Sequence, residues 1–254
     1  MMKISLKHEF EKILLKNEYY LKFNRNLKIN YNNYFSDNLD PDGKKRNLKK
    51  EEKFKLSQLK LIRNFLNENF KKKNKILDFG CGYGWLLKSL NKKKWDKNAI
   101  EINPDANKFV KNLGIDCRKS IDDYNNKYFD IITLIHVIEH LDKPEKTLKK
   151  IVSKIKKKGH LIIETPDFDS AMARRYNLKF RLLHDKTHIS LFSTESLTRL
   201  LMDQNMKIKK IEYPYFEGPF FTKKNILKLF AKKQKTNYSP PFYGSVVTIF
   251  ATKK

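Results

Sequence analysis

The sequence of 254 residues has few cysteines, few arginines and few acidic residues, and it has no long uninterrupted apolar run. Its two cysteines, Cys81 and Cys117, are too few for a disulfide framework and belong to no CxxC pair of the kind found in zinc or redox proteins. Apolar runs such as 131–135 fall far short of the roughly 20 residues that a membrane-spanning helix needs. Charges interrupt the N-terminal segment, which lacks the apolar stretch of a secretory signal, so we expect a cytoplasmic protein.

The scarcity of acidic residues leaves a formal net charge of +27, from 55 basic and 28 acidic residues. Only 8 of the basic residues are arginine, which leaves 47 lysines. Nucleic-acid sites favour arginine because its guanidinium group binds phosphate through two parallel hydrogen bonds. The composition therefore favours lysine enrichment of a solvated surface over a nucleic-acid partner, and the net charge keeps nucleic acid open as an alternative.

Strand and helix patterns alternate along most of the chain. The predicted strands cover 75–79, 97–102, 114–118, 129–135 and 159–164, and two later strands lie near 206–213 and 243–251. The predicted helices cover about 84–93, 104–112 and 143–156, and a capped helix follows Ser193. This alternation predicts an α/β protein, with a seven-stranded, mostly parallel sheet covered by helices on both faces.

Three segments lie outside this pattern. Residues 1–70 carry helix-period apolar positions and a polar, turn-rich connection, and we expect them to form an N-terminal helical lid that contributes to substrate recognition. The sheet domain then spans 71–254 and contains two insertions, at about 166–192 and 214–241. Aromatic residues concentrate in the lid and in the second insertion, where some of them are expected to line an acceptor pocket.

A glycine-rich loop, Asp78-Phe79-Gly80-Cys81-Gly82-Tyr83-Gly84, follows the first predicted strand and opens a helix. Its glycines allow the backbone to approach a ligand at the carboxyl edge of the sheet. Trp85 occupies the position of the third glycine of the dinucleotide fingerprint, which disfavours a nicotinamide cofactor. Glu101 ends the next predicted strand, where a carboxylate accepts hydrogen bonds from a ribose diol. Together these features predict a nucleotide-cofactor site.

At this point the sequence resembles the class I S-adenosylmethionine-dependent methyltransferases. ILDFGCGYGWLL is similar to their first motif, AIEINPDA to the second-strand motif, YFDIITLIHVIEHLDKPEKTL to the fourth-strand segment and GHLIIETPD to the fifth. The resemblance covers about residues 75–203 and is nearest to enzymes that modify small molecules or sugars. It implies a Rossmann-like fold and S-adenosyl-L-methionine as the cofactor.

The resemblance also implies which residues bind the cofactor. The methionine and ribose part would lie against Asp78, Gly80, Cys81, Gly82 and Gly84. Glu101 would hold the ribose hydroxyls, Ile102 would pack on adenine, and Asp122 or Asp123 would accept a hydrogen bond from the adenine amine. His136 would line the same pocket.

His136, Glu139 and His140 form an HxxEH pattern, which at helical spacing would project all three side chains on one face. The pattern is also the inverted zinc-peptidase signature, but that site needs a long helix, whereas this one follows a strand and stops at Pro144. It is similar to the ExxEH motifs of ubiquinone-pathway O-methyltransferases and small-RNA 3′-end methyltransferases, which suggests a metal-assisted site with His184 and His188. We favour a metal-free arrangement in which His140 and Glu139 orient the loop. A divalent metal remains the alternative, with imidazoles selecting zinc or iron over magnesium.

The candidate catalytic residues are His140 and His188. The segment DKTHISLFS resembles one that precedes a late helix in the same broad group of methyltransferases. His188 is expected to face the substrate, as a general base or as a hydrogen-bond anchor. The predicted function is methyl transfer to a small hydroxylated metabolite, with a sugar or glycan precursor as the suggested acceptor. The alternatives are an RNA 2′-O-methyltransferase with a metal-assisted HxxEH site and a cofactor-binding protein without turnover.

The second insertion contains the basic segment NILKLFAKKQK, in which Ile226, Leu227, Leu229 and Phe230 are opposed by lysines. Such a segment either packs against the protein or lies on an anionic membrane surface. Packing is the more common outcome for such a segment, and peripheral membrane contact is kept as an alternative beside the small-molecule acceptor.

Overall fold

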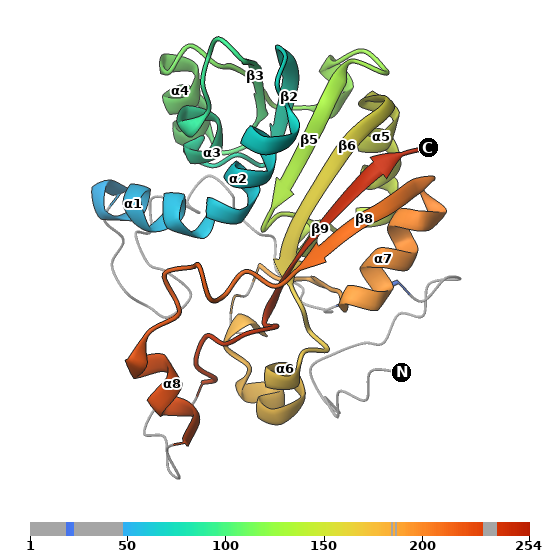
Figure 1. The fold of residues 1–254 in the computed structure, drawn as a ribbon. Helices are drawn as coiled ribbons and strands as arrows, with labels where there is room; N and C mark the ends of the chain where they lie inside the picture. The colour runs from blue at the N-terminus through green and yellow to red at the C-terminus, as the bar shows by residue number, and fades with distance from the viewer. Residues whose placement is uncertain (1–18, 23–47, 184, 186, 231–237) are drawn as a thin grey trace.

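The computed structural model describes residues 19–22, 48–183, 185, 187–230 and 238–254 (Figure 1). A predicted helical segment near residues 10–14 and the aromatic residues Tyr31, Tyr34 and Phe35 lie outside these ranges, as does His184. Within the part of the chain that is described, no helix combines the length and apolar character needed to cross a bilayer.

The central sheet has seven strands in the order β4-β3-β2-β5-β6-β9-β8. Their bounds are β2 Asn74–Phe79, β3 Trp95–Ile100, β4 Asp116–Arg118, β5 Phe129–Ile135, β6 Ile155–Pro166, β8 Met206–Glu212 and β9 Val246–Lys253. β2 pairs in parallel with both β3 and β5, whereas β9 is antiparallel to β6 and β8. The strand order therefore reverses direction at β2 and β5, which is where open α/β sheets bind ligands. The predicted mostly parallel, seven-stranded fold is confirmed.

Helices cover both faces of this sheet (Figure 1). The elements outside the sheet are α1 Leu48–Gln58, α2 Lys60–Asn69, α3 Trp85–Ser89, α4 Pro104–Asn112, α5 Pro144–Lys154, α6 Ala171–Tyr176, α7 Thr194–Asp203 and α8 Lys223–Phe230, with short 3₁₀ turns at Ile121–Asp123, Ile138–His140, Asn177–Lys179 and Arg181–Leu183. α2, α3 and α4 share one apolar cluster with Ile76 and Ile131. α5 and α7 share the opposite cluster with Leu77 and Ile132. Consecutive residues of one strand thus enter different cores, because side chains alternate across a strand.

Local capping sets where two of the helices begin. The Asn103 side chain accepts a hydrogen bond from the Ala106 N–H, and Pro104 occupies the first helical position of α4. Ser193 and Ser196 form a reciprocal capping box at the start of α7. These starts agree with the prediction.

The structure corrects several boundaries. The predicted 84–93 helix is only α3 and ends at Ser89, because Leu90 is already extended. The predicted 143–156 helix ends at Lys154, since Ile155 joins the sheet opposite Phe129 and a bulge separates this pair from the rest of the ladder.

The insertions and the described part of the N-terminal region complete the cores. Tyr19 and Tyr20 are buried in the cluster shared by α5 and α7. A two-residue ladder pairs β1, Leu21–Lys22, with β7, Ser190–Leu191. The first insertion forms a third apolar cluster around Phe168, Phe180 and Leu183, against which Leu229 of α8 packs.

Gly80 shows how closely the loops after β2 and β5 approach each other. It has a φ of +73°, and a Cβ added to it would lie 2.6 Å from Val137 Cγ2. Gly114 has a φ of +74° but no atom within 4 Å of the same added Cβ. Both glycines therefore have a left-handed backbone that would strain any other residue, but only at Gly80 would an added Cβ also clash with a neighbouring side chain.

We predict that Gly80→Ala destabilises the protein by about 2–4 kcal/mol, because left-handed strain and overpacking add. Gly114→Ala should cost about 1–2 kcal/mol, since only the strain applies. Urea unfolding monitored by circular dichroism measures both. Equal losses of stability would contradict the close packing of Val137 on Gly80.

Candidate active site

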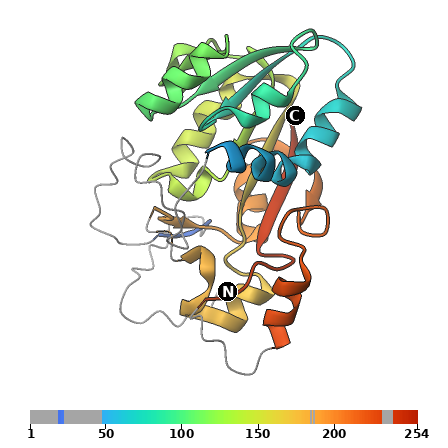
Figure 2. The ribbon, with the colours of Figure 1, turned by 90° about the vertical axis from the view of Figure 1, so that its left-hand side faces the viewer.

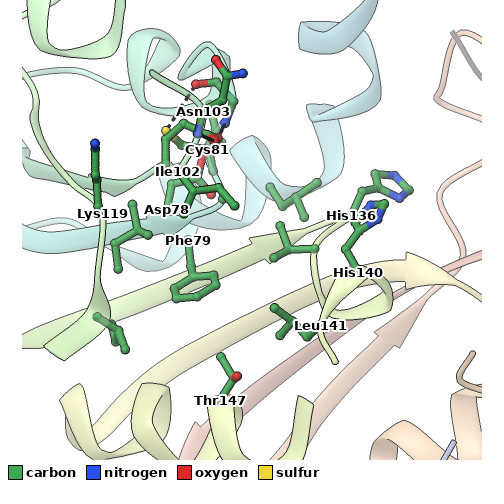
Figure 3. A pocket seen from close by; sticks show the side chains of 18 of the residues that line it. Asp78, Phe79, Cys81, Ile102, Asn103, Lys119, His136, His140, Leu141 and Thr147 are labelled. Atoms are coloured by element: carbon green, nitrogen blue, oxygen red, sulfur yellow. Dashed lines mark hydrogen bonds between the residues drawn. The ribbon is translucent and has the colours of Figure 1, made fainter. Parts of the chain in front are cut away.

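A cavity of about 700 Å³ opens at the carboxyl edge of the sheet, at the point where the strand order reverses (Figure 3). One wall consists of the glycine loop and the segment that follows β3. The other consists of the segment after β5, including His136, His140 and Leu141. Glu51 and Lys55 of α1 contribute to the lining, so the described part of the predicted lid borders the cavity.

The backbone of the glycine loop is held in a strained form that glycine tolerates. Gly80, Gly82 and Gly84 have φ values of +73°, +55° and +69°. The N–H groups of Gly80 and Cys81 both donate to the Ile100 carbonyl oxygen, at 2.8 and 3.1 Å. The loop after β2 is thus bound to the end of β3, and it lines the cavity with Gly80 and Gly82 together with the side chains of Phe79, Cys81, Tyr83 and Trp85.

Glu101 connects the same two loops through its side chain. Its Oε2 accepts a hydrogen bond from the Gly82 N–H, and its Oε1 accepts one from the Asn103 N–H, both at 2.8 Å. Burial raises the pKa of Glu101, although these backbone hydrogen bonds oppose the rise. Each carboxylate oxygen has a second lone-pair direction, so the group can still accept hydrogen bonds from a ribose diol at the cavity. The structure places Glu101 as the sequence predicts, just after β3.

Asp78 lies at the carboxyl end of β2 and is only 4% exposed. Thr133 of β5 donates a hydrogen bond of 2.6 Å to its Oδ1. Burial raises the pKa of Asp78 to about 7, because the loss of hydration outweighs the hydrogen bond from Thr133. Asp78 can therefore exchange a proton near neutral pH and respond to a cationic ligand.

Cys81 lines the cavity, and its thiol donates a hydrogen bond of 3.5 Å to the Gly82 carbonyl oxygen. The neighbouring Cys117 thiol raises the pKa of Cys81, and burial raises it further. A thiol in this state is a weak nucleophile, so Cys81 serves as part of the wall.

The far end of the cavity contains the residues predicted to contact adenine. Ile102 is 48% exposed and lines the cavity, as an apolar surface for a flat ring requires. Asp122 also lines it, but its Oδ2 accepts a hydrogen bond of 2.7 Å from Lys150 Nζ. This contact lowers the pKa of Asp122, so the carboxylate is ionised and remains a candidate acceptor for an amine.

The HxxEH pattern does not occupy one helix face, which corrects the prediction. His136 follows β5 with a φ of +53°, and only 138–140 form a single 3₁₀ turn. The His136 ring consequently turns between two carboxylates, with Nδ1 3.4 Å from Glu139 Oε1 and Nε2 3.5 Å from Glu164 Oε1. Burial alone would lower the pKa of His136, but the two carboxylates raise it to about 9. His136 is therefore an imidazolium in the cavity wall at neutral pH.

Glu139 is fully buried, and Thr165 Oγ1 donates a hydrogen bond of 2.9 Å to its Oε2. Burial would raise the pKa of Glu139, but His136 and the neighbouring histidines lower it to about 2. Its Oε1 has no hydrogen-bond partner among the described residues. The His136 ring, 3.4 Å away, offsets the charge of this oxygen without a short hydrogen bond, which leaves a lone pair for a further cation or proton donor.

Glu139, His140 and His188 form a cluster whose candidate ligand atoms lie within 4.8 Å of one another. His140 Nδ1 lies 3.0 Å from the Thr187 carbonyl oxygen, and His188 Nδ1 lies 2.6 Å from the Leu182 carbonyl oxygen. When these Nδ1 atoms donate to the carbonyls, each ring has its lone pair on Nε2. Backbone carbonyls orient metal-binding histidines in the same way.

The structure places His188 behind His140, with ring centroids 4.8 Å apart, and not in the cavity wall. His188 is only 6% exposed, and burial lowers its pKa to about 4, so its ring is neutral at pH 7. The expectation that His188 faces the substrate directly is therefore not met. Its ring instead packs against the ring of His140.

Sequence reasoning did not identify Glu164, Thr165 and Asp185 as parts of this site. Glu164 and Thr165 are buried near the end of β6, and Asp185 Oδ2 lies 3.7 Å from His188 Nε2. A charged residue within the apolar segment GHLIIETP was the available signal, because a buried carboxylate needs a partner.

The fold and the cavity define an α/β protein that binds a nucleotide cofactor at the carboxyl edge of its sheet. The family model of the methyltransferase domain matches residues 51–211. The chain belongs to this family, and the predicted class is confirmed.

Curated relatives include the mitochondrial ubiquinone biosynthesis O-methyltransferases of two yeasts. The Schizosaccharomyces pombe protein is 26% identical over 175 residues, which cover 58% of this chain and 62% of the relative. The Saccharomyces cerevisiae protein is 32% identical over 108 residues, which cover 37% of this chain and 34% of the relative. The chain thus matches less than two thirds of the length of either relative.

Solved structures show the same fold. A SAM-dependent methyltransferase from Archaeoglobus fulgidus superposes with a TM-score of 0.56 at 23% identity, covering 80% of this chain and 97% of that structure. This likeness establishes a methyltransferase-type Rossmann-like architecture.

The His136 ion pairs predict a specific pH dependence of stability. The folded pKa of about 9 lies above the ordinary 6.5, so the stabilisation is complete below pH 6.5 and is lost as the pH rises toward 9. We predict that the loss of the His136 proton lowers the free energy of unfolding by up to about 3 kcal/mol between pH 6.5 and pH 9. His136→Gln should lack this component.

Urea unfolding at several pH values measures the effect, with His160→Gln as the matched control. Burial lowers the pKa of His160, so its removal should leave the loss between pH 6.5 and 9 unchanged. The same slope in His136→Gln as in the wild type would show that His136 is not an imidazolium.

Proposed function

We propose that this protein transfers the methyl group of S-adenosyl-L-methionine to a hydroxyl oxygen of a small acceptor. The observation that carries the proposal is the Glu101 carboxylate, held by the Gly82 and Asn103 N–H groups beside a loop of three left-handed glycines. The names of the yeast relatives support an oxygen acceptor. A phenol or a sugar or glycan precursor would both present such a hydroxyl.

The cofactor would lie along the wall formed by the loops after β2 and β3. Glu101 would accept hydrogen bonds from the ribose hydroxyls, and Ile102 would contact the adenine ring. Asp78, at the base of the glycine loop, would face the positively charged methionine part, where its ionised form is favoured.

Methyl transfer is an in-line displacement, in which the sulfur–carbon bond breaks as the carbon–oxygen bond forms. The products are S-adenosylhomocysteine and a methyl ether, and the acceptor hydroxyl loses its proton. Alignment supplies much of the rate, and a base near the hydroxyl supplies the rest. His140 is the candidate base, because it lies in the cavity wall and its ring is oriented by the Thr187 carbonyl.

The cluster of Glu139, His140 and His188 also fits a divalent metal ion. Two oriented imidazoles and a buried carboxylate oxygen without a hydrogen-bond partner provide three ligands, and this donor set favours zinc or iron(II) over magnesium. A bound ion would lower the pKa of an acceptor hydroxyl. His136 is excluded from this donor set by its contacts with Glu139 and Glu164. A bound ion would share this oxygen with the His136 ring, which lies 3.4 Å from it.

Calorimetric titration with S-adenosylhomocysteine tests the cofactor site. We predict binding in the micromolar range that Glu101→Gln weakens by about tenfold or more, because charge-assisted hydrogen bonds to ribose are lost. Asp105→Asn is the matched control, since it removes one exposed carboxylate from the start of α4. Absence of binding by the folded wild-type protein would defeat the proposed function.

Metal analysis of the purified protein tests whether Glu139, His140 and His188 bind a metal ion. Equilibrium dialysis against zinc should load about one ion per chain, because the three donors meet at one point. His140→Asn and Glu139→Gln should abolish this loading, and His160→Asn, outside the cluster, should retain it. If the wild-type protein takes up no zinc or iron(II) but binds S-adenosylhomocysteine, the cluster acts as a metal-free base.

A further inference from the structure

An exposed apolar surface lies around the second insertion, separate from the cofactor cavity. Its members are large apolar side chains that remain at least 43% exposed in the structure: Phe216, Phe221, Leu227, Phe230, Tyr238 and Tyr243. The Phe216 ring lies 5.3 Å from both Phe221 and Tyr243, measured between centroids. We refer to these six residues as the aromatic patch. Three of the six are thus in ring contact, and Leu227 and Phe230 lie on α8, which begins two residues after Phe221. Exposed apolar surface of this kind is typical of an interaction site.

α8 presents one side of itself to the protein and another to solvent. Leu229 packs against the third apolar cluster, and the Arg175 guanidinium donates to its carbonyl oxygen. Leu227 and Phe230 point away and are 69% and 77% exposed. The basic segment therefore does not bury all four of its apolar residues, and two of them remain on its outer side. Burying such side chains in an apolar phase is strongly favourable.

The charges around the patch have one dominant sign. Among the described residues between 213 and 244 there are three lysines, Lys223, Lys224 and Lys228, and a single acidic residue. That acidic residue, Glu217, lies 3.4 Å from Lys60 and is partly neutralised by it. Lys224 and Lys228 are one helical turn apart on α8 and flank its outer apolar side. Any surface that binds here must accept apolar side chains and supply negative charge.

The patch adjoins the wall of the cavity. Phe220 contacts Phe54 of α1 with ring centroids 5.2 Å apart, and the neighbouring Lys55 lines the cavity. Figure 2 shows α8 and α1 on the same side of the molecule. A surface bound at the patch would therefore lie near the helix that borders the site.

We propose that the aromatic patch docks on the surface of an anionic lipid bilayer. Leu227 and Phe230 enter the boundary between headgroups and acyl chains, and the surrounding lysines contact the anionic headgroups. Exposed rings such as Tyr238 and Tyr243 suit the same boundary, because one end of tyrosine is apolar and the other polar. This docking does not depend on the methyltransferase activity, and it would give the enzyme access to acceptors held in membranes.

Vesicle co-sedimentation of the full chain, without substrate or cofactor, tests the apolar part. The wild type should bind phosphatidylcholine vesicles that contain phosphatidylglycerol more tightly than vesicles of phosphatidylcholine alone. Leu227→Glu combined with Phe230→Glu should weaken this binding by about tenfold or more, since both inserted side chains are lost. Met202→Glu is the matched control, because Met202 is 53% exposed on α7, away from the patch. Circular dichroism of each variant verifies folding.

A second pair of variants tests the charges. Lys224→Gln with Lys228→Gln should weaken binding to the anionic vesicles by about fivefold for each lysine removed. Lys207→Gln with Lys209→Gln, two exposed positions on β8, should have a smaller effect. No binding to anionic vesicles, or equal loss in test and control variants, would overturn the proposal. Light scattering that shows a dimer separated by the Leu227 and Phe230 changes would also overturn it, because a second copy would then cover the patch.

Discussion

Two backbone N–H groups, those of Gly82 and Asn103, converge on the Glu101 carboxylate, and the shape of the cavity depends on this convergence. The contact joins the loop after β2 to the loop after β3, and the Ile100 carbonyl joins them again from below. The carboxyl group can be buried here because two of its four lone-pair directions accept these backbone hydrogen bonds, and the other two remain for a ligand. The carboxylate therefore organises the loops and faces the ligand at the same time.

The cavity wall formed by the segment after β5 contains buried charged groups, Glu139, Glu164 and His136 among them. Glu139 has no exposed surface, yet its pKa is lowered to about 2, because His136 and the other histidines offset the cost of burial. The same carboxylate and that of Glu164 raise the pKa of His136 to about 9. Such an array holds its geometry only while opposite charges remain in contact, since an unpaired buried charge is strongly destabilising. The position of His140 in the cavity wall depends on this balance.

The insertions connect the site to the outside of the molecule. The first insertion supplies Leu182 and Thr187, whose carbonyls orient the two histidines, and it also forms the third apolar cluster. α8 packs on that cluster through Leu229, which leaves Leu227 and Phe230 exposed. One packing arrangement thus positions both the chemical groups and the apolar surface.

Much of the cofactor site was predictable, because it follows from local rules. A strand that runs into Gly80, Gly82 and Gly84, and an acidic residue at the end of the next strand, must meet at one sheet edge when the strands are parallel. The capped starts of α4 and α7 are local for the same reason. The helix-face interpretation of HxxEH failed, because pairing of β5 with β6 brings Glu164 beside His136 and turns its ring.

The sequence by itself determined the order of strands and helices, the glycine loop and the acidic partner, since each depends on residues close together in the chain or on strand periodicity. Only the tertiary structure decided which histidine faces the cavity, which carboxylates share its charge and which apolar residues of α8 stay exposed. Those outcomes depend on contacts between segments far apart in the chain, such as Glu139 with His188 and Arg175 with Leu229, and local sequence patterns carry no information on them.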